Sequence, residues 1–250
     1  MNLVNFFFSP TGGTLKAVEL LDKELGLPST MYDLTSPLDE VRLDQNSLAL
    51  FAVPSFAGRC PQLALDNLKK VKGNGTKAII VTTYGNRAFD DTLIELKDNV
   101  ESLGFVPVAA LALVTQHSIF PMFASRRPNK SDELWIKIAT GQIKAKLETD
   151  NTDLQVPGKR PYKAIGPNPL KPIVETEKCT KCGLCAEKCP THAIDKAHPN
   201  TTEIAKCISC MRCLSLCPSK ARYLDSETYN AVYNKLLPAL KEIKKNLLFL

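Results

Sequence analysis

The cysteines are the residues whose spacing points most directly to chemistry, because eight of the nine lie between positions 179 and 217. They form two segments, CTKCGLCAEKCP at 179–190 and CISCMRCLSLCP at 207–218, which share the spacing C-x2-C-x2-C-x3-C-P. The segments are offset by 28 residues, so this part of the chain is an internal repeat. An odd cysteine count without a secretory signal argues against a disulfide framework, and the tight clustering argues for metal binding.

This spacing favours iron–sulfur clusters over structural zinc. Three cysteines at intervals of three residues can wrap one face of a cubane cluster, and a fourth, followed by proline, points away and reaches a second cluster. Zinc sites more often use two separated pairs of ligands. The ligands expected for one cluster are Cys179, Cys182, Cys185 and Cys217, and those for the other are Cys207, Cys210, Cys213 and Cys189.

A second candidate site lies near the N-terminus, where SPTGGT (9–14) stands between an apolar run and a helical pattern. Its hydroxyl groups and the backbone N–H groups at the start of the helix can hold a phosphate without a dedicated cation. The segment lacks the Lys-Ser/Thr of a P-loop and the G-x-G-x-x-G spacing of a dinucleotide fingerprint. A helix cap without any ligand is the alternative reading.

Two later loops, PSFAGRCP (54–61) and TYGNRAFDD (83–91), each set an aromatic residue beside small ones after an apolar run. Such loops can form a slot for a flat ring, with aromatic faces to stack on and backbone groups at the polar edge. Three roles stay open. Arg87 either faces such a ring or pairs with a neighbouring aspartate. Cys60 is either a small loop residue or a redox thiol, and the first role is favoured. His117 is either a core or capping residue or a proton donor, and again the first role is favoured.

The apolar pattern predicts the elements that position these loops. Short apolar runs alternate with amphipathic helices, which predicts βα units and a doubly wound parallel sheet. In such a sheet the loops at the carboxyl ends of the strands meet beside the switch point. The runs lie at 3–8, 48–53, 77–83 and 105–114, and the helices at about 14–25, 89–103 and 131–147.

These patterns divide the chain into four parts. Residues 1–150 form the α/β domain, and 151–172 form a proline-rich linker or an irregular segment laid over a surface. Residues 173–225 form the cysteine-rich domain, and 226–250 form a C-terminal amphipathic helix. Pro238 is expected to kink that helix. Its apolar stripe is expected to pack against the rest of the protein rather than against a membrane or a partner helix, and it consists of Tyr229, Val232, Tyr233, Leu236, Leu240, Ile243 and Leu247.

The composition is ordinary for a globular protein, but the charge is uneven. Residues 1–154 carry 16 Lys/Arg against 18 Asp/Glu, and residues 155–250 carry 16 against 8. The basic half favours a redox partner protein with an acidic docking surface over nucleic acid, because its lysines are scattered and aromatic residues are sparse; a generic solvated surface is an equally good reading. The sequence shows no signal peptide and no run of roughly 18 apolar residues, so we expect no membrane span and a cytoplasmic location.

The cysteine-rich domain resembles a bacterial-type ferredoxin, and the whole chain resembles the flavodoxin–ferredoxin hybrid proteins of anaerobic bacteria and archaea. The resemblance rests on SPTGGT, PSFAGRCP, TYGNRAFDD and the two cysteine motifs. It implies a flavodoxin-like five-stranded sheet that binds FMN, followed by a small α+β domain that holds two [4Fe–4S] clusters. The sequence departs from simple flavodoxins at Gly13, where asparagine is common, and at Arg87, which brings a cation to the ring loop.

The resemblance also implies which residues bind FMN. Ser9, Thr11, Gly12, Gly13 and Thr14 bind the phosphate. Gly58 is expected to contact the flavin N5, because a glycine peptide can reorient at low cost. The residues expected around the ring are Pro54, Ser55, Phe56, Ala57, Gly58, Thr83, Tyr84, Gly85, Asn86, Arg87, Phe89 and Asp90.

Three functions are compatible with these features. FMN accepts two electrons together or singly, whereas each cluster carries one. The first function is therefore an electron-transfer protein between a low-potential donor and a partner enzyme. The second is a flavin-dependent reductase of a small molecule, and the third is an iron–sulfur redox sensor. The sequence favours the carrier, because no acid–base pair stands out in the first domain and no effector domain supports a sensor.

Overall fold

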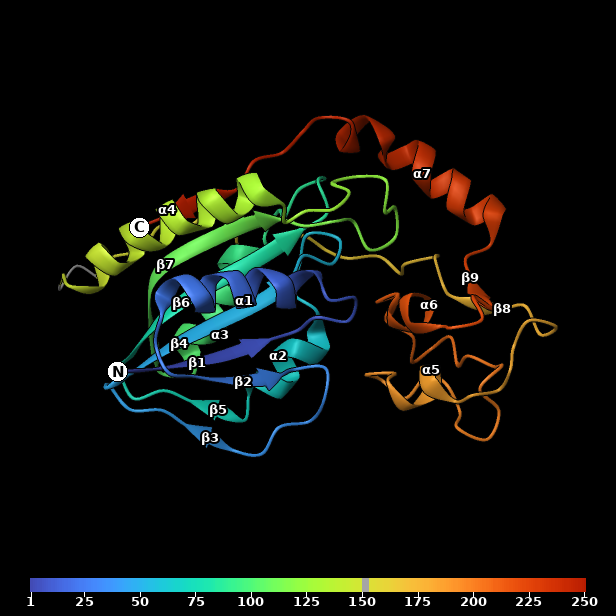
Figure 1. The fold of residues 1–250 in the computed structure, drawn as a ribbon, viewed down its shortest axis with the longest axis horizontal. Helices are drawn as coiled ribbons and strands as arrows, with labels where there is room; N and C mark the ends of the chain where they lie inside the picture. The colour runs from blue at the N-terminus through green and yellow to red at the C-terminus, as the bar shows by residue number, and fades with distance from the viewer. Residues whose placement is uncertain (150–152) are drawn as a thin grey trace. The chain divides into compact units, whose positions relative to one another are not determined.

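The computed structural model describes residues 1–149 and 153–250, and the chain divides into two compact units (Figure 1). Each unit is built from segments that are far apart in the sequence. The first comprises Met1–His117, Pro121–Ile165 and Glu242–Leu250, and the second comprises Ser118–Phe120 and Gly166–Lys241.

The first unit is built on a six-stranded sheet in the order β10-β7-β6-β4-β1-β2. Five strands are parallel, and β10 (Leu247–Phe249) runs antiparallel to β7. Counted along the chain, the parallel strands follow the order 2-1-3-4-5 of flavodoxin-like doubly wound folds. This order confirms the α/β class that the sequence predicts. The parallel strands are β1 (Asn2–Phe7), β2 (Ser29–Asp33), β4 (Ser47–Pro54), β6 (Thr76–Tyr84) and β7 (Phe105–Val114).

The strands in the middle of the sheet are the ones that the sequence reveals. Nearly every residue of β4, β6 and β7 is buried, because helices cover both faces of a parallel sheet. Such strands must be apolar on both faces and therefore read as unbroken apolar runs. β2 lies at the edge, exposes most of its residues and has no apolar run, so the sequence gives no sign of it.

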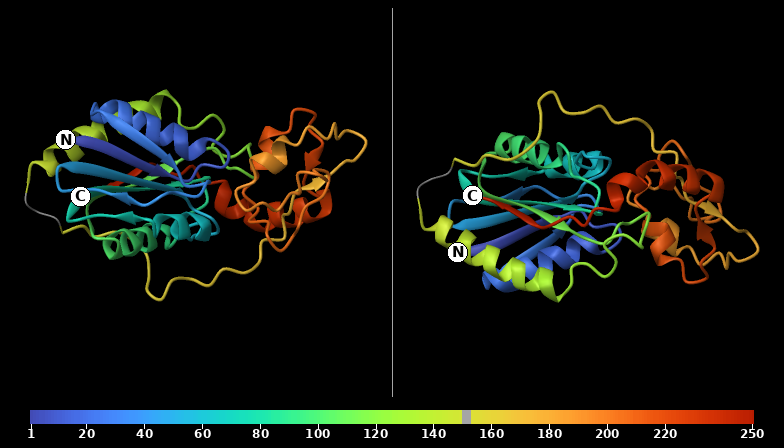
Figure 2. Two further views of the ribbon diagram at one scale, coloured as in Figure 1. Left: turned by 90° about the horizontal axis from the view of Figure 1, so that it is seen from below. Right: turned by 90° about the horizontal axis from the view of Figure 1, so that it is seen from above.

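Two longer helices and two shorter ones enclose this sheet (Figure 2). α1 (Gly13–Leu25) and α4 (Lys130–Leu147) cover one face, and α2 (Gln62–Leu68) and α3 (Thr92–Ser102) cover the other. The end of α1 is fixed by Gly26, which adopts a φ of +69° and donates to the Asp22 carbonyl. The start of α4 is fixed by a capping box formed by Asn129 and Asp132. A parallel pair of two-residue strands, β3 (Val41–Arg42) and β5 (Val71–Lys72), lies apart from the main sheet.

The C-terminal segment differs from the single helix predicted for 226–250. α7 (Ser226–Leu240) ends two residues after Pro238, and the chain then forms β10. Pro238 has no N–H to donate within the helix. The outer edge of β7 would otherwise present unpaired backbone groups, and β10 covers part of it. Ile243, which the helical stripe places on a packed face, is 84% exposed.

The proline-rich segment is partly fixed rather than a free linker. Its predicted start at 151–152 lies outside the described residues. Residues 153–165 belong to the first unit, where the backbone N–H groups of Lys159 and Lys163 donate to the Asp91 carboxylate at 2.9 and 2.7 Å. The alternative of an irregular segment laid over a surface therefore describes this stretch.

The second unit has little regular structure. β8 (Ile173–Val174) pairs antiparallel with β9 (Arg222–Tyr223), and the short helices α5 (Leu184–Glu187) and α6 (Arg212–Leu216) each contain the third cysteine of a motif. None of the helices in the described parts of the chain is long and apolar enough to cross a membrane.

Candidate functional site

The two cysteine motifs adopt the same local backbone conformation. Lys181 and Ser209, which precede the second cysteine of each motif, both have a φ of +55°. Gly183 and Met211, which follow that cysteine, are left-handed as well, with φ of +77° and +64°. The left-handed conformation is unusual for residues other than glycine, so its recurrence at equivalent positions shows that the sequence repeat is also a structural repeat.

The two copies of the repeat exchange their ends. The N–H of Glu203, before the second motif, donates to the carbonyl of Ala193, after the first motif, at 2.7 Å. The N–H of Glu175, before the first motif, donates to the carbonyl of Ala221, after the second, at 2.9 Å. Each fourth cysteine is therefore carried toward the other copy, as its position before proline predicts.

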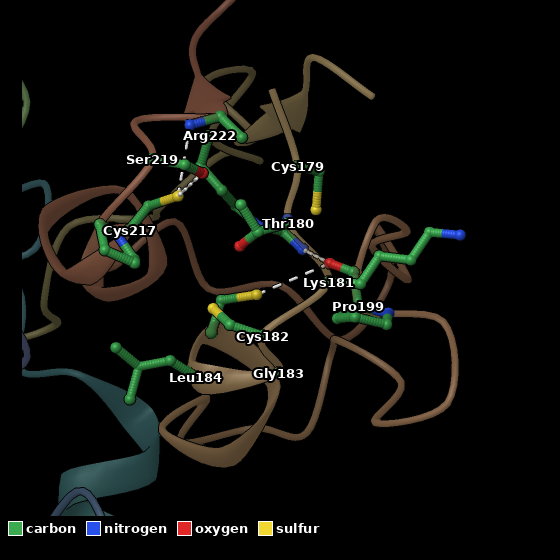
Figure 3. Close-up of a pocket in the computed structure, with 13 residues that line it drawn as sticks. Cys179, Thr180, Lys181, Cys182, Gly183, Leu184, Pro199, Cys217, Ser219 and Arg222 are labelled. Carbon is green, nitrogen blue, oxygen red and sulfur yellow. Dashed lines mark hydrogen bonds between the residues drawn. The ribbon is translucent and has the colours of Figure 1, made fainter. Parts of the chain in front are cut away.

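This exchange brings the eight cysteines together in two sets of four. Each set lines a cavity, of about 320 Å³ for the first and about 340 Å³ for the second, including space open to solvent. Figure 3 shows the first cavity, with Cys179, Cys182 and Cys217 around it. The first cavity is lined by Cys179, Cys182, Cys185 and Cys217, and the second by Cys189, Cys207, Cys210 and Cys213.

Backbone groups are aimed at the sulfur of each fourth cysteine. The Cys189 Sγ accepts the N–H of Ala193, and the Cys217 Sγ accepts the N–H of Ala221, both at 3.3 Å. Burial raises the pKa of the Cys217 thiol, but hydrogen bonds from the Ser219 hydroxyl and nearby backbone N–H groups outweigh it and leave the pKa lowered. These donors stabilise a thiolate, which is the form that binds iron.

The donor set fits a cubane cluster. Burial raises the pKa of Cys210 to about 11 and that of Cys213 to about 12, so their thiolate forms at neutral pH require a stabilising cation such as cluster iron. No three His, Cys, Asp or Glu side chains of residues 1–149 and 153–250 are grouped closely enough to hold a single ion. Each set of four sulfurs instead surrounds a space, and a cubane carries its ligands on different iron atoms.

The N-terminal loop places backbone donors at the start of α1. Gly12 is the N-cap residue with a φ of +86° and has no side chain to cap the helix, so the N–H groups of Gly13 and Thr14 at the start of the helix are the ones able to meet an anion. Thr11 is exposed there, whereas the Ser9 hydroxyl accepts the N–H of Leu15 at 2.9 Å. Ser9 thus shapes the loop, and Thr11 with the backbone is the part able to meet a phosphate.

Hydroxyl groups also tie the three predicted flavin loops together. The Thr14 and Thr83 hydroxyls are buried and 2.8 Å apart, which joins the start of α1 to the end of β6. The Thr92 hydroxyl donates to the Ser55 hydroxyl at 2.8 Å, which joins α3 to the loop after Pro54. The structure therefore brings the loops together at the carboxyl ends of β1, β4 and β6, the place where doubly wound sheets bind ligands.

The loop after β4 contains a tight turn. Phe56 and Arg59 exchange backbone hydrogen bonds of 2.9 and 3.1 Å, and Ala57 and Gly58 between them have φ of +54° and +90°, as in a type I′ turn. A Cβ on Gly58 would lie 2.2 Å from the Asp90 Oδ2. The turn and this close approach already require glycine, so the contact of Gly58 with a flavin N5 stays a prediction.

The loop after β6 is held by the C-terminal tail, residues Glu242–Leu250, and the sequence did not predict this contact. The Tyr84 hydroxyl donates to the Lys245 carbonyl at 2.8 Å. The Asn86 amide donates to the Glu242 carbonyl at 2.9 Å and accepts the N–H of Lys244 at 3.0 Å. Both side chains are buried and are held in place by the tail. The tail thus fixes the shape of a loop expected to border the ring.

Charged side chains occupy the rest of this loop. Arg87 forms an ion pair with Asp90 at 2.7 Å, which is the pairing with a neighbouring aspartate that the sequence left open. Lys163 forms an ion pair with the same carboxylate at 2.6 Å. Burial raises the pKa of Asp90, but these two cations outweigh it and lower the pKa. The Phe89 ring lies 5.3 Å from the Tyr84 ring, so this part of the predicted ring site is packed against itself.

His117 and Cys60 both have structural environments. Burial and the nearby charge of Arg87 lower the pKa of His117 to about 4, and a Cβ on Gly85 would lie 2.7 Å from the His117 Cα. The Cys60 thiol donates to the Thr92 carbonyl at 3.3 Å, and burial raises its pKa well above the usual value. His117 is thus neutral at pH 7, and Cys60 is a protonated thiol, in agreement with their reading as packing residues.

Comparison with known families supports the second unit directly. Two models described as 4Fe-4S binding domains match residues 172–195 and 204–229. No curated protein matches the chain. The two matched segments contain the two cysteine motifs, so the second unit is a ferredoxin-type 4Fe–4S domain.

Comparison with solved structures finds proteins similar to the first unit. The chain is similar to the rubredoxin oxygen:oxidoreductase of the anaerobe Desulfovibrio gigas, at 13% identity and a TM-score of 0.42, over 59% of this chain and 37% of that one. It is also similar to a flavodoxin from Streptococcus pneumoniae TIGR4, at 17% identity and a TM-score of 0.40, over 58% of this chain and 99% of that one. A third similar structure is flavodoxin 1 from Bacillus cereus, at 14% identity and a TM-score of 0.43, over 58% of this chain and 98% of that one. The strand order itself makes the first unit flavodoxin-like, and the chain is therefore a fusion of a flavodoxin-like domain with a ferredoxin-type domain.

Proposed function

We propose that this chain is an electron-transfer flavo-iron–sulfur protein that passes electrons between a low-potential donor and a partner enzyme. The observation that supports this most is the separation of eight cysteines into two sets of four around two cavities. Each set supplies the thiolates of one [4Fe–4S] cluster, and each cluster carries one electron at a time. The count of two clusters is part of the proposal.

The proposed flavin is FMN, with its phosphate at residues 11–14. Gly12 does not cap the N–H groups of Gly13 and Thr14 at the start of α1, and Thr11 adds a hydroxyl. No cation is needed there, because the helix dipole favours an anion. When bound, FMN supplies a centre that exchanges either one or two electrons, which links two-electron partners to one-electron clusters. The turn at 56–59 and the loop at 84–87 are the proposed borders of the ring.

A reductase that delivers protons to a small molecule has less support. His117 follows the last parallel strand, and its lowered pKa of about 4 keeps its imidazole neutral at pH 7, so it lacks the extra proton of an imidazolium acid. The electron carrier requires no such group. The basic half of the chain, with 16 Lys/Arg against 8 Asp/Glu in residues 155–250, supports an acidic docking surface on the partner.

The assignment of the phosphate loop is tested with Thr11→Glu. Protein purified without oxygen is expected to carry about eight irons and one FMN per chain. The added carboxylate should abolish FMN binding by like-charge repulsion and leave the iron content unchanged. Thr30→Glu is the matched control, because Thr30 is an exposed threonine at the start of β2, at the opposite end of the sheet. Loss of iron with FMN retained, or FMN binding equal to that of the control, would contradict the proposal.

A further inference from the structure

The two cysteine cavities differ in the residues that cover them. In the second copy of the repeat, Ile208 and Met211 line the cavity, and Met211 is 1% exposed. The equivalent residues, 28 positions earlier, are Thr180 and Gly183, which line the first cavity. A Cβ on Gly183 would meet nothing within 4 Å, so this place beside the first cavity is open space. The first cavity thus lacks the two apolar side chains that cover the second.

The cysteines at this part of the repeat differ in exposure as well. Cys182 is exposed and lies at the first cavity (Figure 3), whereas the equivalent Cys210 is only partly exposed. Electron transfer between two proteins requires a short distance between their redox centres, because electronic coupling falls steeply with separation. At this position the first set of thiolates therefore allows a partner the closer approach.

Two lysines lie beside the first cavity and are replaced by other residues in the second copy. Lys181 lines the first cavity, and its side chain points away from the cysteines (Figure 3). Lys220 stands between two residues that line the same cavity, and both lysines are exposed. The equivalent residues of the other copy are the buried Ser209 and the exposed His192. The first cavity is thus bordered by two cations that the second does not have.

These two lysines are not neutralised by carboxylates. In the parts of the chain that the structure describes, neither ammonium group forms an ion pair, whereas Lys178 pairs with Glu175 at 2.8 Å. Glu177 is exposed, but it does not line the first cavity. The edge of the first cavity therefore presents two unpaired positive charges beside an exposed ligand, which is complementary to a surface rich in carboxylates.

We propose that the surface formed by residues 180–183 and 218–220, which we name the first rim, docks a redox protein whose own centre is surrounded by carboxylates. Electrons then enter and leave the chain through the cluster held by Cys179, Cys182, Cys185 and Cys217. In each transfer one electron passes between this cluster and the centre of the partner, and no bond forms or breaks. The donor loses one negative charge and the acceptor gains it. This inference rests on the proposed function, because it requires both clusters.

The first test measures access to each cluster with trioxalatochromate(III), a paramagnetic trianion that leaves the oxidation state unchanged. In the full chain, Cys189→Ala with Cys207→Ala should retain the first cluster alone, and Cys179→Ala with Cys217→Ala the second alone. After reduction with dithionite without oxygen, power saturation of the electron paramagnetic resonance signal should show faster relaxation of the first cluster by the anion. Adding Lys181→Glu to the variant with the first cluster should weaken this effect and strengthen that of the cation hexaamminechromium(III).

The second test measures electron transfer from the chain with both clusters. Reduced protein is mixed with a limiting amount of trioxalatocobaltate(III), a trianion that accepts one electron, and the loss of the cluster signal is followed after rapid freezing. Lys181→Glu with Lys220→Glu should slow the reaction about fivefold or more at low salt, because the encounter is no longer steered by opposite charges. The difference should shrink at high salt.

A matched control separates the first rim from net charge. Lys196→Glu with Lys235→Glu makes the same change in charge at two exposed lysines outside the first rim, and it should alter the rate less than about twofold. Poly-L-glutamate, which presents the carboxylates of the expected partner, should slow the reaction of the wild type and have little effect on Lys181→Glu with Lys220→Glu.

The outcomes separate this inference from the proposed function. Wild-type protein without two clusters would refute the proposed function. Two clusters that relax equally, faster relaxation of the second, or equal rates in the two pairs of lysine variants would refute the docking role of the first rim. If a single-cluster variant loses its iron, the comparison of the two pairs of lysine variants decides alone.

Discussion

The two candidate sites are built in different ways. In the ferredoxin-type unit, local spacing supplies three ligands of each cavity, and a fourth arrives from the other copy of a repeat 28 residues away. In the flavodoxin-like unit, the loops come from separate strands, and the tail of the chain holds one of them through Tyr84 and Asn86. A local motif therefore determines one site, whereas long-range packing determines the other.

The largest effect expected from this comparison concerns the exchanged fourth cysteine. Cys189→Ala combined with Cys207→Ala damages only the second cavity, so about four irons per chain should remain. Cys189→Ala combined with Cys179→Ala damages both cavities and should remove nearly all iron. Iron analysis of anaerobically purified protein measures both. The reverse result, with about four irons kept in the Cys189→Ala, Cys179→Ala variant and nearly none in the Cys189→Ala, Cys207→Ala variant, would show that Cys189 binds the cluster of its own motif.

A smaller effect is expected at the tail of the flavodoxin-like unit. The Asn246 side chain accepts the N–H of Val114 at 2.9 Å and donates to Asp132 at 2.9 Å, and all three groups are buried. Asn246→Ala leaves the buried Val114 N–H without its acceptor and removes one donor from Asp132, which keeps Arg127 and Asn129. It should lower the free energy of unfolding of this unit by about 1–3 kcal/mol. It should also weaken flavin binding, because the tail fixes the loop at 84–86.

Denaturant unfolding and a flavin titration measure these two changes. Asn234→Ala is the matched control, since Asn234 is an exposed asparagine on α7. Iron content should stay unchanged in both variants. Equal stability and flavin affinity in the two variants would show that the tail merely lies on the sheet.

The smallest effect concerns pH. The pKa of His117 is lowered from 6.5 to about 4, so the unfolded chain binds a proton in this window that the folded chain does not. Stability is therefore lost as pH falls from about 6.5 to about 4. At pH 5 the loss from this group is at most about 2 kcal/mol, at 1.36 kcal/mol per pKa unit. His117→Gln should remove this part, seen as a smaller difference in unfolding free energy between pH 7 and pH 5; an unchanged difference would refute it.

The same comparison explains what could be read from the sequence. The cysteine sets were predictable because one motif, repeated, carries both the ligands and their exchange. The buried strands β4, β6 and β7 were predictable because a parallel sheet requires unbroken apolar runs. The α/β fold followed from their alternation with helices.

The rest depends on contacts that local patterns do not encode. Tyr84 and Lys245 are 161 positions apart, and nothing in the residues 242–246 marks them as partners of the β6 loop. Pro238 signalled a disturbed helix but not that the chain leaves it to pair with β7. Arg222 lies four residues beyond the second cysteine motif, and only the structure shows that it is buried with its Nε–H unpartnered.

One measurement tests the central claim that a flavin and two clusters share this chain. Wild-type protein is reduced stepwise with dithionite under strict exclusion of oxygen, and the electrons taken up per chain are counted. The account predicts about four electrons, two at FMN and one at each cluster, and about two in Thr11→Glu. Uptake of only about two electrons by the wild type, whether at a flavin alone or at clusters alone, would contradict it.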